Sequence, residues 1–243
     1  MNAIILGEFI GCVFLIIFGG GVVANTLLTK SKGINAGWFA ISAGWGFAVM
    51  GGVFVAKSVG SDQADLNPAV TLAKYLLGGI YSLQEIFPIF ISQFAGCFVG
   101  AILVWLTYFP HWKETKDPSL KLAVFSTGPA IRHSAANLMA EVIGTTILVF
   151  GIGAIFGKAT NNGAISPALG PYLVGILVWA IGLSLGGATG YAINPARDLG
   201  PRIAHFLLPI AGKGKSDWKY SWVPVVGPVL GGIIGAYLWK TFL

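Results

Sequence analysis

The same three residues, Asn-Pro-Ala, open two short apolar segments of the chain. Proline is favoured at the first position of a helix, where its missing N–H costs no hydrogen bond. An asparagine immediately before it occupies the N-cap, where its side chain can accept hydrogen bonds from free backbone N–H groups. Each copy therefore predicts an abrupt helix start with a polar amide at the positive end of the helix dipole. The two copies comprise Asn67, Pro68 and Ala69, and Asn194, Pro195 and Ala196.

The composition is that of a membrane protein. Of the 243 residues, 55% are hydrophobic and only 10% are charged, whereas soluble domains carry about 25% charged residues. A helix needs ~20 mostly apolar residues to cross a bilayer, and the segments that follow Asn67 and Asn194 are too short for this. Six longer apolar segments fit such helices, at about 4–28, 36–56, 86–109, 135–156, 171–185 and 222–238.

The same composition excludes several functions. The net charge of +6 is spread over loops rather than gathered in a stripe, which argues against nucleic-acid binding. Cys12 and Cys97 both lie in apolar segments and support neither a disulfide framework nor a metal site. No nucleophile–base arrangement is evident, so we expect neither an enzyme nor a cofactor.

Matched residues in the two halves of the chain indicate an internal duplication. Glu8 precedes a glycine by three residues in the first apolar segment, and Glu141 does so in the fourth. Together with the Asn-Pro-Ala copies, these matches occur in the same order and at nearly one spacing. Three crossings per half turn the second half upside down relative to the first. We therefore predict one channel domain, 1–243, with inverted repeats over about 1–110 and 134–243.

The two short segments have one physically acceptable arrangement. Irregular backbone at membrane depth is tolerated only where protein buries it or where it lines a wet cavity. If two half-helices enter from opposite faces, their starts meet near the middle and both Asn amides face one passage. Two positive helix ends and two amide donors orient a neutral solute and repel cations. The prediction is an all-α integral membrane protein with six transmembrane helices, two re-entrant half-helices and a pore for small uncharged molecules.

These motifs resemble those of the aquaporin family, the major intrinsic proteins, over essentially the whole chain. The run 189–201, in which Asp198 follows Arg197, is most similar to the bacterial glycerol facilitator (aquaglyceroporin) branch. The resemblance implies a passive glycerol channel with some water flux, and a homotetramer in the plasma membrane with cytoplasmic termini. It also implies that Glu8 and Glu141 accept hydrogen bonds from the re-entrant loops. From the residues alone, these carboxylates could instead relay protons.

Carried over by position, the resemblance implies a selectivity filter of Trp45, Gly182, Tyr191 and Arg197. Arg197 would donate hydrogen bonds to solute hydroxyls, and two aromatic faces would form an apolar wall opposite it. Gly182 would give the filter its width. The family's glycerol channels usually have Phe where this chain has Tyr191. Because Tyr191 adds a hydroxyl, we expect the filter to pass other small polar neutrals beside glycerol, such as undissociated lactic acid.

Asp65 departs from the family, which usually has His at this position two residues before Asn67. It would place an acidic group near one pore mouth. An ion-coupled transporter, which can also contain inverted repeats and broken helices, would need such a carboxylate. A water-selective channel is the nearer alternative, which Gly182 and Asp198 disfavour. A structural adhesion protein built on this fold would have a blocked pore, whereas Gly182 predicts a wide one.

The distribution of basic residues opposes the orientation that the resemblance implies. With cytoplasmic termini, the inner segments would hold only four of the 15 Lys and Arg residues, namely Lys57, Lys74, Lys158 and Lys240. The positive-inside rule prefers the reverse orientation. Cytoplasmic termini are therefore expected from the resemblance and not from charge.

Overall fold

Six long helices fall on the six apolar segments of the sequence. The computed structural model describes residues 2–157, 166 and 169–243, so Lys158 and most of the loop that it begins lie outside the described residues. Five of the long helices have the length and hydropathy to cross a membrane, and the sixth is apolar with 17 residues. The predicted all-α fold class is confirmed, with no strand among the described residues. The helices are α1 (Asn2–Leu27), α2 (Gly37–Val59), α4 (Leu83–Thr107), α7 (Ser134–Phe156), α9 (Leu169–Leu185) and α11 (Val223–Phe242).

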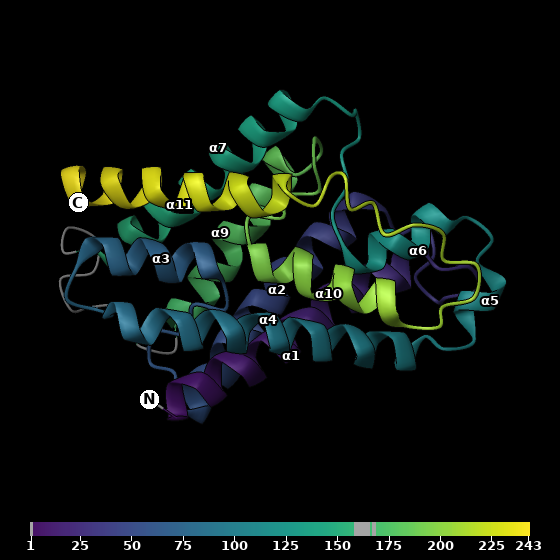
Figure 1. The fold of residues 1–243 in the computed structure, drawn as a ribbon, viewed down its shortest axis with the longest axis horizontal. Coiled ribbons are helices and arrows are strands. Elements are labelled where there is room, and N and C mark those ends of the chain that lie inside the picture. Colours follow the sequence, from purple (N-terminus) through teal and green to yellow (C-terminus); the bar gives the residue numbers. More distant parts are fainter. Residues whose placement is uncertain (1, 158–165, 167–168) are drawn as a thin grey trace.

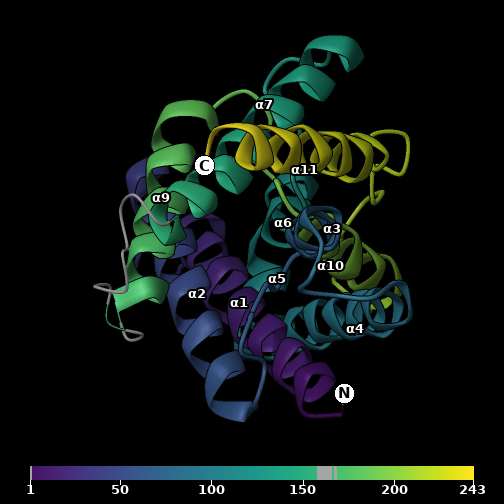
Figure 2. The same cartoon turned by 90° about the vertical axis from the view of Figure 1, so that its left-hand side faces the viewer.

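Two short helices, α3 (Pro68–Leu77) and α10 (Pro195–Leu207), lie end to end in the middle of the molecule. Figure 1 shows their first turns facing one another, and Figure 2, turned by 90°, places the two along one line of sight. Each helix begins with proline directly after an asparagine N-cap, as the sequence predicts. Both half-helices pack against α4, and α3 also packs against α11. The short segments are therefore enclosed by the long helices.

Glycines let the helices that surround the half-helices approach closely. A Cβ on Gly46 of α2 would come within 2.8 Å of the carbonyl oxygen of Gly175 on α9, and a Cβ on Gly175 would meet the oxygen of Gly46 at the same distance. Small residues at a crossing allow backbones to touch, which is how helices associate within a membrane. The contact brings the first half of α2 beside α9, where the candidate filter residues lie.

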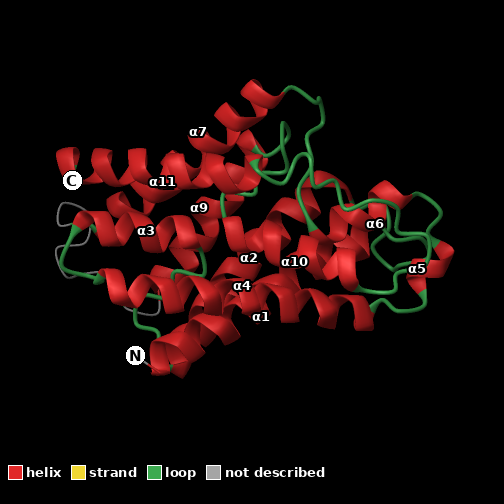
Figure 3. Ribbon diagram, viewed as in Figure 1, coloured by secondary structure: helices red, strands yellow, loops and turns green. Residues whose placement is uncertain are grey.

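The connection between the two halves contains more structure than the sequence predicted. We expected a long polar connection over 110–133, but the chain forms α5 (His111–Glu114) and α6 (Pro118–Phe125) there. Trp112 and Phe125 are buried between these helices and the rest of the molecule. Figure 3 shows α5 and α6 with the longest loops at one end of the bundle. Helices this short have too few turns to give a readable hydrophobic period.

Candidate functional site: a central pore

The two loops that precede α3 and α10 have the same unusual backbone. Ala64 and Leu66 have φ values of 44° and 54°, and Tyr191 and Ile193 have values of 38° and 42°. These residues lie three and one positions before their asparagine, so the left-handed conformations recur in register. Left-handed backbone at residues other than glycine costs ~1–3 kcal/mol each and is retained mainly at functional sites.

Buried glutamates hold both loops in place. Glu8 of α1 accepts hydrogen bonds from the backbone N–H groups of Asp65 and Leu66, each at 2.8 Å. Glu141 of α7 accepts them from Ala192 and Ile193 at 2.9 and 2.8 Å. A buried carboxylate requires such donors, and the loops require acceptors for N–H groups that no helix satisfies. All four carboxylate oxygens accept hydrogen bonds from these loops, as the resemblance implied.

Asn67 and Asn194 join the two loops at the centre. The side-chain oxygen of each caps its own half-helix, accepting from Ala69 N at 2.9 Å and from Ala196 N at 3.0 Å. The amide nitrogen of Asn67 donates to the carbonyl of Ile193, and that of Asn194 to the carbonyl of Leu66, both at 2.7 Å. An amide nitrogen carries two hydrogens. Each asparagine therefore keeps one donor that these protein contacts do not use.

A cavity of about 420 Å³ runs past both asparagines. Trp45, Val49, Val53 and Lys57 line it at intervals of four residues, so that it follows one face of α2 for ~18 Å. Most of its wall is apolar, and the two amides lie part-way along it. Among the described residues, its wall reaches Trp45, Tyr191 and Arg197 but extends no further along α2 toward the helix start. The predicted filter residues Trp45, Tyr191 and Arg197 therefore lie at one end of the cavity.

Arg197 lies on Trp45 rather than opposite it. The guanidinium Cζ is 3.9 Å from the centre of the indole ring, a cation–π stack. Trp45 is fixed from behind, because a Cβ on Gly19 of α1 would come within 2.3 Å of its ring. The side chain of Arg197 donates no hydrogen bond to the described residues, so its N–H donors remain for a solute or for water. We expected the aromatic side chains to form a wall opposite the arginine. Instead Trp45, one of the two, lies directly against the guanidinium.

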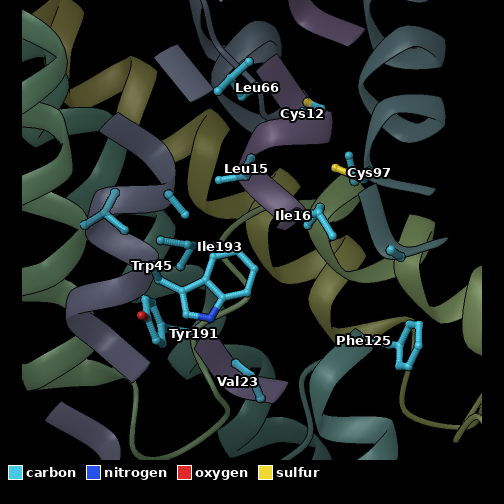
Figure 4. Close-up of a cluster of buried hydrophobic side chains, with 14 of the residues drawn as sticks. Cys12, Leu15, Ile16, Val23, Trp45, Leu66, Cys97, Phe125, Tyr191 and Ile193 are labelled. Carbon is cyan, nitrogen blue, oxygen red and sulfur yellow. The ribbon is translucent and has the colours of Figure 1, made fainter. Parts of the chain in front are cut away.

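Gly182 does not widen the cavity directly. A Cβ at this position would lie 2.7 Å from both Cζ and the hydroxyl oxygen of Tyr191, so the tyrosine ring occupies the space above the glycine. Figure 4 shows Tyr191 next to Trp45 on the inner side of the bundle. The buried hydroxyl of Tyr191 has no partner among the described residues. Gly182 therefore makes room for Tyr191 rather than leaving open space of its own, and its contribution to the width of the filter stays a prediction.

Asp198 anchors the start of α10 to the connection between the halves. One of its oxygens accepts hydrogen bonds from the backbone N–H and the hydroxyl of Thr127, both at 2.7 Å. Arg202, one turn later, forms a fully buried ion pair with the same carboxylate at 2.8 Å. These contacts hold the backbone that carries Arg197.

Asp65 does not present a free carboxylate to the cavity. Its side chain is fully buried, with one oxygen paired to the ammonium of Lys74. The other oxygen accepts hydrogen bonds from Thr71 at 2.9 Å and from Tyr81 at 2.8 Å. The expectation of an acidic group acting at the pore mouth is therefore corrected, because its charge is neutralised by Lys74.

Sequence reasoning overlooked several residues that shape the site. Lys74 is a cation in an otherwise apolar half-helix, which could have marked it as a partner for Asp65. Gln93 bridges Glu8 and Thr71 through its amide nitrogen at 2.8 and 3.0 Å. Its place inside an apolar helix was a comparable signal, since polar side chains within membrane helices are costly.

Comparison with known proteins agrees with this geometry. The model of the family described as "Major intrinsic protein" matches residues 2–239. The chain belongs to the major intrinsic protein family. This confirms the resemblance drawn from the Asn-Pro-Ala motifs, and it places the chain among channels and facilitators rather than enzymes.

This major intrinsic protein is 54% identical over 238 residues to the "Probable glycerol uptake facilitator protein" of Thermotoga maritima, a match that covers 98% of each chain. It is 39% identical over 242 residues to the "D/L-lactic acid transporter" of Lactiplantibacillus plantarum, covering 98% of this chain and 97% of that protein. The X-ray structure of the aquaglyceroporin from Plasmodium falciparum superimposes with a TM-score of 0.86 at 27% identity. That match covers 99% of this chain and 96% of the other.

Proposed function

We propose that this protein is a passive channel for glycerol that also conducts some water. The observation that carries the proposal is the meeting of two Asn-capped helix starts beside a cavity of about 420 Å³. A solute in the cavity meets one free donor from each of Asn67 and Asn194, while its carbon backbone meets apolar walls. Glycerol, with hydroxyls along one edge and carbons along the other, suits such a passage. The glycerol uptake facilitators among its relatives support this choice.

The predicted filter residues at the end of the cavity would select the solute. Arg197 supplies donors and a fixed positive charge, which attracts hydroxyl oxygens and repels cations. Trp45 and Tyr191 supply the aromatic surface, and Gly182 leaves the space that the ring of Tyr191 occupies. The two Asn-Pro-Ala copies are not equivalent, because Val70 stands where the second copy has Arg197. We therefore assign solute selection to the second copy and solute orientation to both.

The experiment that tests the proposal is stopped-flow light scattering on proteoliposomes that contain the purified protein. Under an inward glycerol gradient, the vesicles should re-swell faster than empty liposomes and faster than vesicles with Asn67→Asp and Asn194→Asp together. A water-selective channel, the alternative, would speed the initial shrinkage without speeding re-swelling. An ion-coupled transporter would respond to a membrane potential, to which glycerol uptake should be indifferent.

Undissociated lactic acid is a second proposed solute. The hydroxyl of Tyr191 has no partner among the described residues, and the relatives of this chain include a D/L-lactic acid transporter. A buried hydroxyl without a partner costs ~1–3 kcal/mol, which a tilt of the ring toward a hydrogen-bonding solute in the filter would recover.

We also propose a homotetramer in the plasma membrane with cytoplasmic termini and the inverted repeats described above. Large apolar side chains such as Phe39, Ile91 and Tyr237 are exposed on the outside of the single chain, where lipid or a second subunit can cover them. Mass measurement of the detergent-solubilised protein tests the tetramer. A reporter fused after Leu243 tests the orientation. Its detection outside the cell would contradict cytoplasmic termini.

A further inference from the structure

Trp38 touches the filter without lining it. It is the second residue of α2, seven residues before Trp45, and 39% of its surface is exposed. Its indole N–H donates a hydrogen bond of 2.9 Å to the carbonyl of Gly182 on α9. Its ring packs edge-on against Tyr191, with the ring centres 5.8 Å apart and the planes at 74°. One side chain therefore contacts two of the four predicted filter residues.

The hydrogen bond secures the end of a helix. Gly182 lies in the last turn of α9, which ends at Leu185, and carbonyl groups in a last turn have no partner within their own helix. The indole N–H supplies a partner for this carbonyl. It thereby fixes the backbone of α9 at the residue against which Tyr191 lies.

The ring contact leaves Tyr191 little room to move. A Cβ on Gly186 would come within 2.5 Å of Cδ1 of Tyr191 and 2.6 Å of Cζ2 of Trp38. A Cβ on Gly182 would meet the other end of the tyrosine ring at 2.7 Å. The ring is therefore held between the glycine face of α9 and the edge of Trp38. Its hydroxyl makes no hydrogen bond to the described residues, so packing alone sets its position.

We propose that Trp38 is a positioning residue for the filter, which sets the aperture by holding Gly182 and Tyr191 in place. It acts through these two residues and does not touch the solute. Without the indole, Tyr191 can tilt away from Arg197 into the vacated space, so that the filter widens. The consequence is weaker discrimination by size among linear polyols. The inference rests on the proposed function, because it concerns the solute that the filter admits.

The test measures glycerol, erythritol and ribitol uptake by proteoliposomes and expresses each as a ratio within one preparation. Such a ratio does not depend on how much folded protein each preparation contains, so a loss of stability alone does not change it. Trp38→Leu should lower the glycerol-to-ribitol ratio by about fivefold, since a small change in pocket size shifts discrimination by such factors. Trp38→Phe keeps an aromatic ring but loses the N–H, and should lower the ratio by about twofold. Trp38→Phe also keeps the inference testable if the Trp38→Leu protein does not fold.

Trp179 provides a matched control. It lies on α9 and packs against Phe39 and Phe47 of α2, with ring centres 5.6 and 6.0 Å away. Its indole N–H has no partner among the described residues. Trp179→Leu removes an equally large side chain from the same helix pair, and should leave the polyol ratio unchanged.

A second variant tests whether Trp38 acts through the tyrosine. In a Tyr191→Ala background, where no ring remains to be held, Trp38→Leu should cause no further change in the ratio. An unchanged ratio in both Trp38 variants, an equal fall in Trp179→Leu, or additive effects with Tyr191→Ala would overturn the inference. If the parent channel passes no polyol, the proposed function fails and the inference fails with it. If the parent passes glycerol but the Trp38 variants keep its ratio, only the inference fails.

Discussion

The guanidinium of Arg197 stacks on the indole ring of Trp45, with Cζ 3.9 Å from the ring centre. The stack leaves the N–H donors at the rim of the guanidinium free while its face is covered. A passing solute can therefore hydrogen-bond to the rim, although it cannot slide between the two side chains as they stand. This relationship places the charge that we propose selects the solute at one end of the cavity.

Arg197→Ala should lower the ratio of glycerol to water permeability by about tenfold. A hydrogen bond to a charged group contributes ~1.5–3 kcal/mol, and its loss leaves solute hydroxyls without compensation for the water that they give up. The loss of the fixed charge should also admit cations, measured as dissipation of a potassium diffusion potential. Stopped-flow light scattering measures the ratio. Arg132→Ala is the matched control, since that arginine pairs with Asp217 at an exposed site. An unchanged ratio of glycerol to water permeability in Arg197→Ala would show that the arginine does not contribute to selectivity.

Gly182→Ala should reduce glycerol permeability by about tenfold while reducing water permeability less. The new methyl group would stand 2.7 Å from the ring of Tyr191, and overpacking of this kind shifts side chains at a cost of ~1–3 kcal/mol. The ring can yield only toward the cavity. A second substitution, Tyr191→Ala, should restore the flux because it removes the obstructing ring.

Gly187→Ala is the control for the glycine prediction. Nothing lies within 4 Å of a Cβ at that position, so the variant should behave like the parent. If Gly182→Ala and Gly187→Ala reduce glycerol permeability equally, the contact with Tyr191 is not the cause of the reduction.

The helices could be predicted from the sequence because hydropathy and proline carry local information. The half-helix starts at Pro68 and Pro195 are examples, since an Asn-Pro pair determines an N-cap by its own chemistry. The proposed filter residues Trp45, Tyr191 and Arg197 could be assigned by position in the sequence, and they do lie along one cavity. Their mutual packing could not, because it depends on how α2 and α9 cross at Gly46 and Gly175.

The roles assigned to Gly182 and Asp65 illustrate the same limit. Gly182 was interpreted as open space, but whether a glycine leaves a gap or admits a neighbouring side chain is decided by a residue elsewhere in the chain. Asp65 was interpreted as a charged group at the pore, but Lys74 lies nine residues later and reaches it only because α3 turns back alongside the loop. The lone lysine in an apolar half-helix was a local signal, but the sequence does not show that its side chain reaches Asp65.

Lys74→Met should destabilise the folded protein far more than the loss of a surface lysine. Removing one partner of a buried ion pair leaves an uncompensated charge and costs ~3–5 kcal/mol. The side chain of Asp65 is fully buried and that of Lys74 is 10% exposed. The midpoint of thermal unfolding in detergent should therefore fall, and the additional Asp65→Asn substitution should recover part of the loss by removing the charge.

Lys30→Met is the control for this prediction. Its ion pair with Glu114 is 2.6 Å long but 71% and 43% exposed, and exposed pairs contribute only ~0–1 kcal/mol. The midpoint of thermal unfolding of Lys30→Met should stay close to that of the parent. Equal effects of the two lysine substitutions would show that the pair with Asp65 has no special role.

Lactic acid uptake should rise steeply as the external pH falls toward the pKa of the acid, because the apolar walls of the cavity penalise the charged lactate anion and admit the undissociated form. Titration of the channel's own exposed carboxylates should not produce the same dependence of uptake on pH. Hydrogen bonding from Lys30 lowers the pKa of Glu114, and hydrogen bonding from Ser119 lowers the pKa of Asp117. Both groups therefore stay ionised to a lower pH than unperturbed carboxylic acids of their kind. Glycerol uptake in the same vesicles should stay constant with pH.

Tyr191→Phe, which removes the unpartnered hydroxyl, should reduce lactic acid uptake more than glycerol uptake. A lactic acid flux that does not change with pH would mean that the anion is carried, which a passive channel with this filter does not permit.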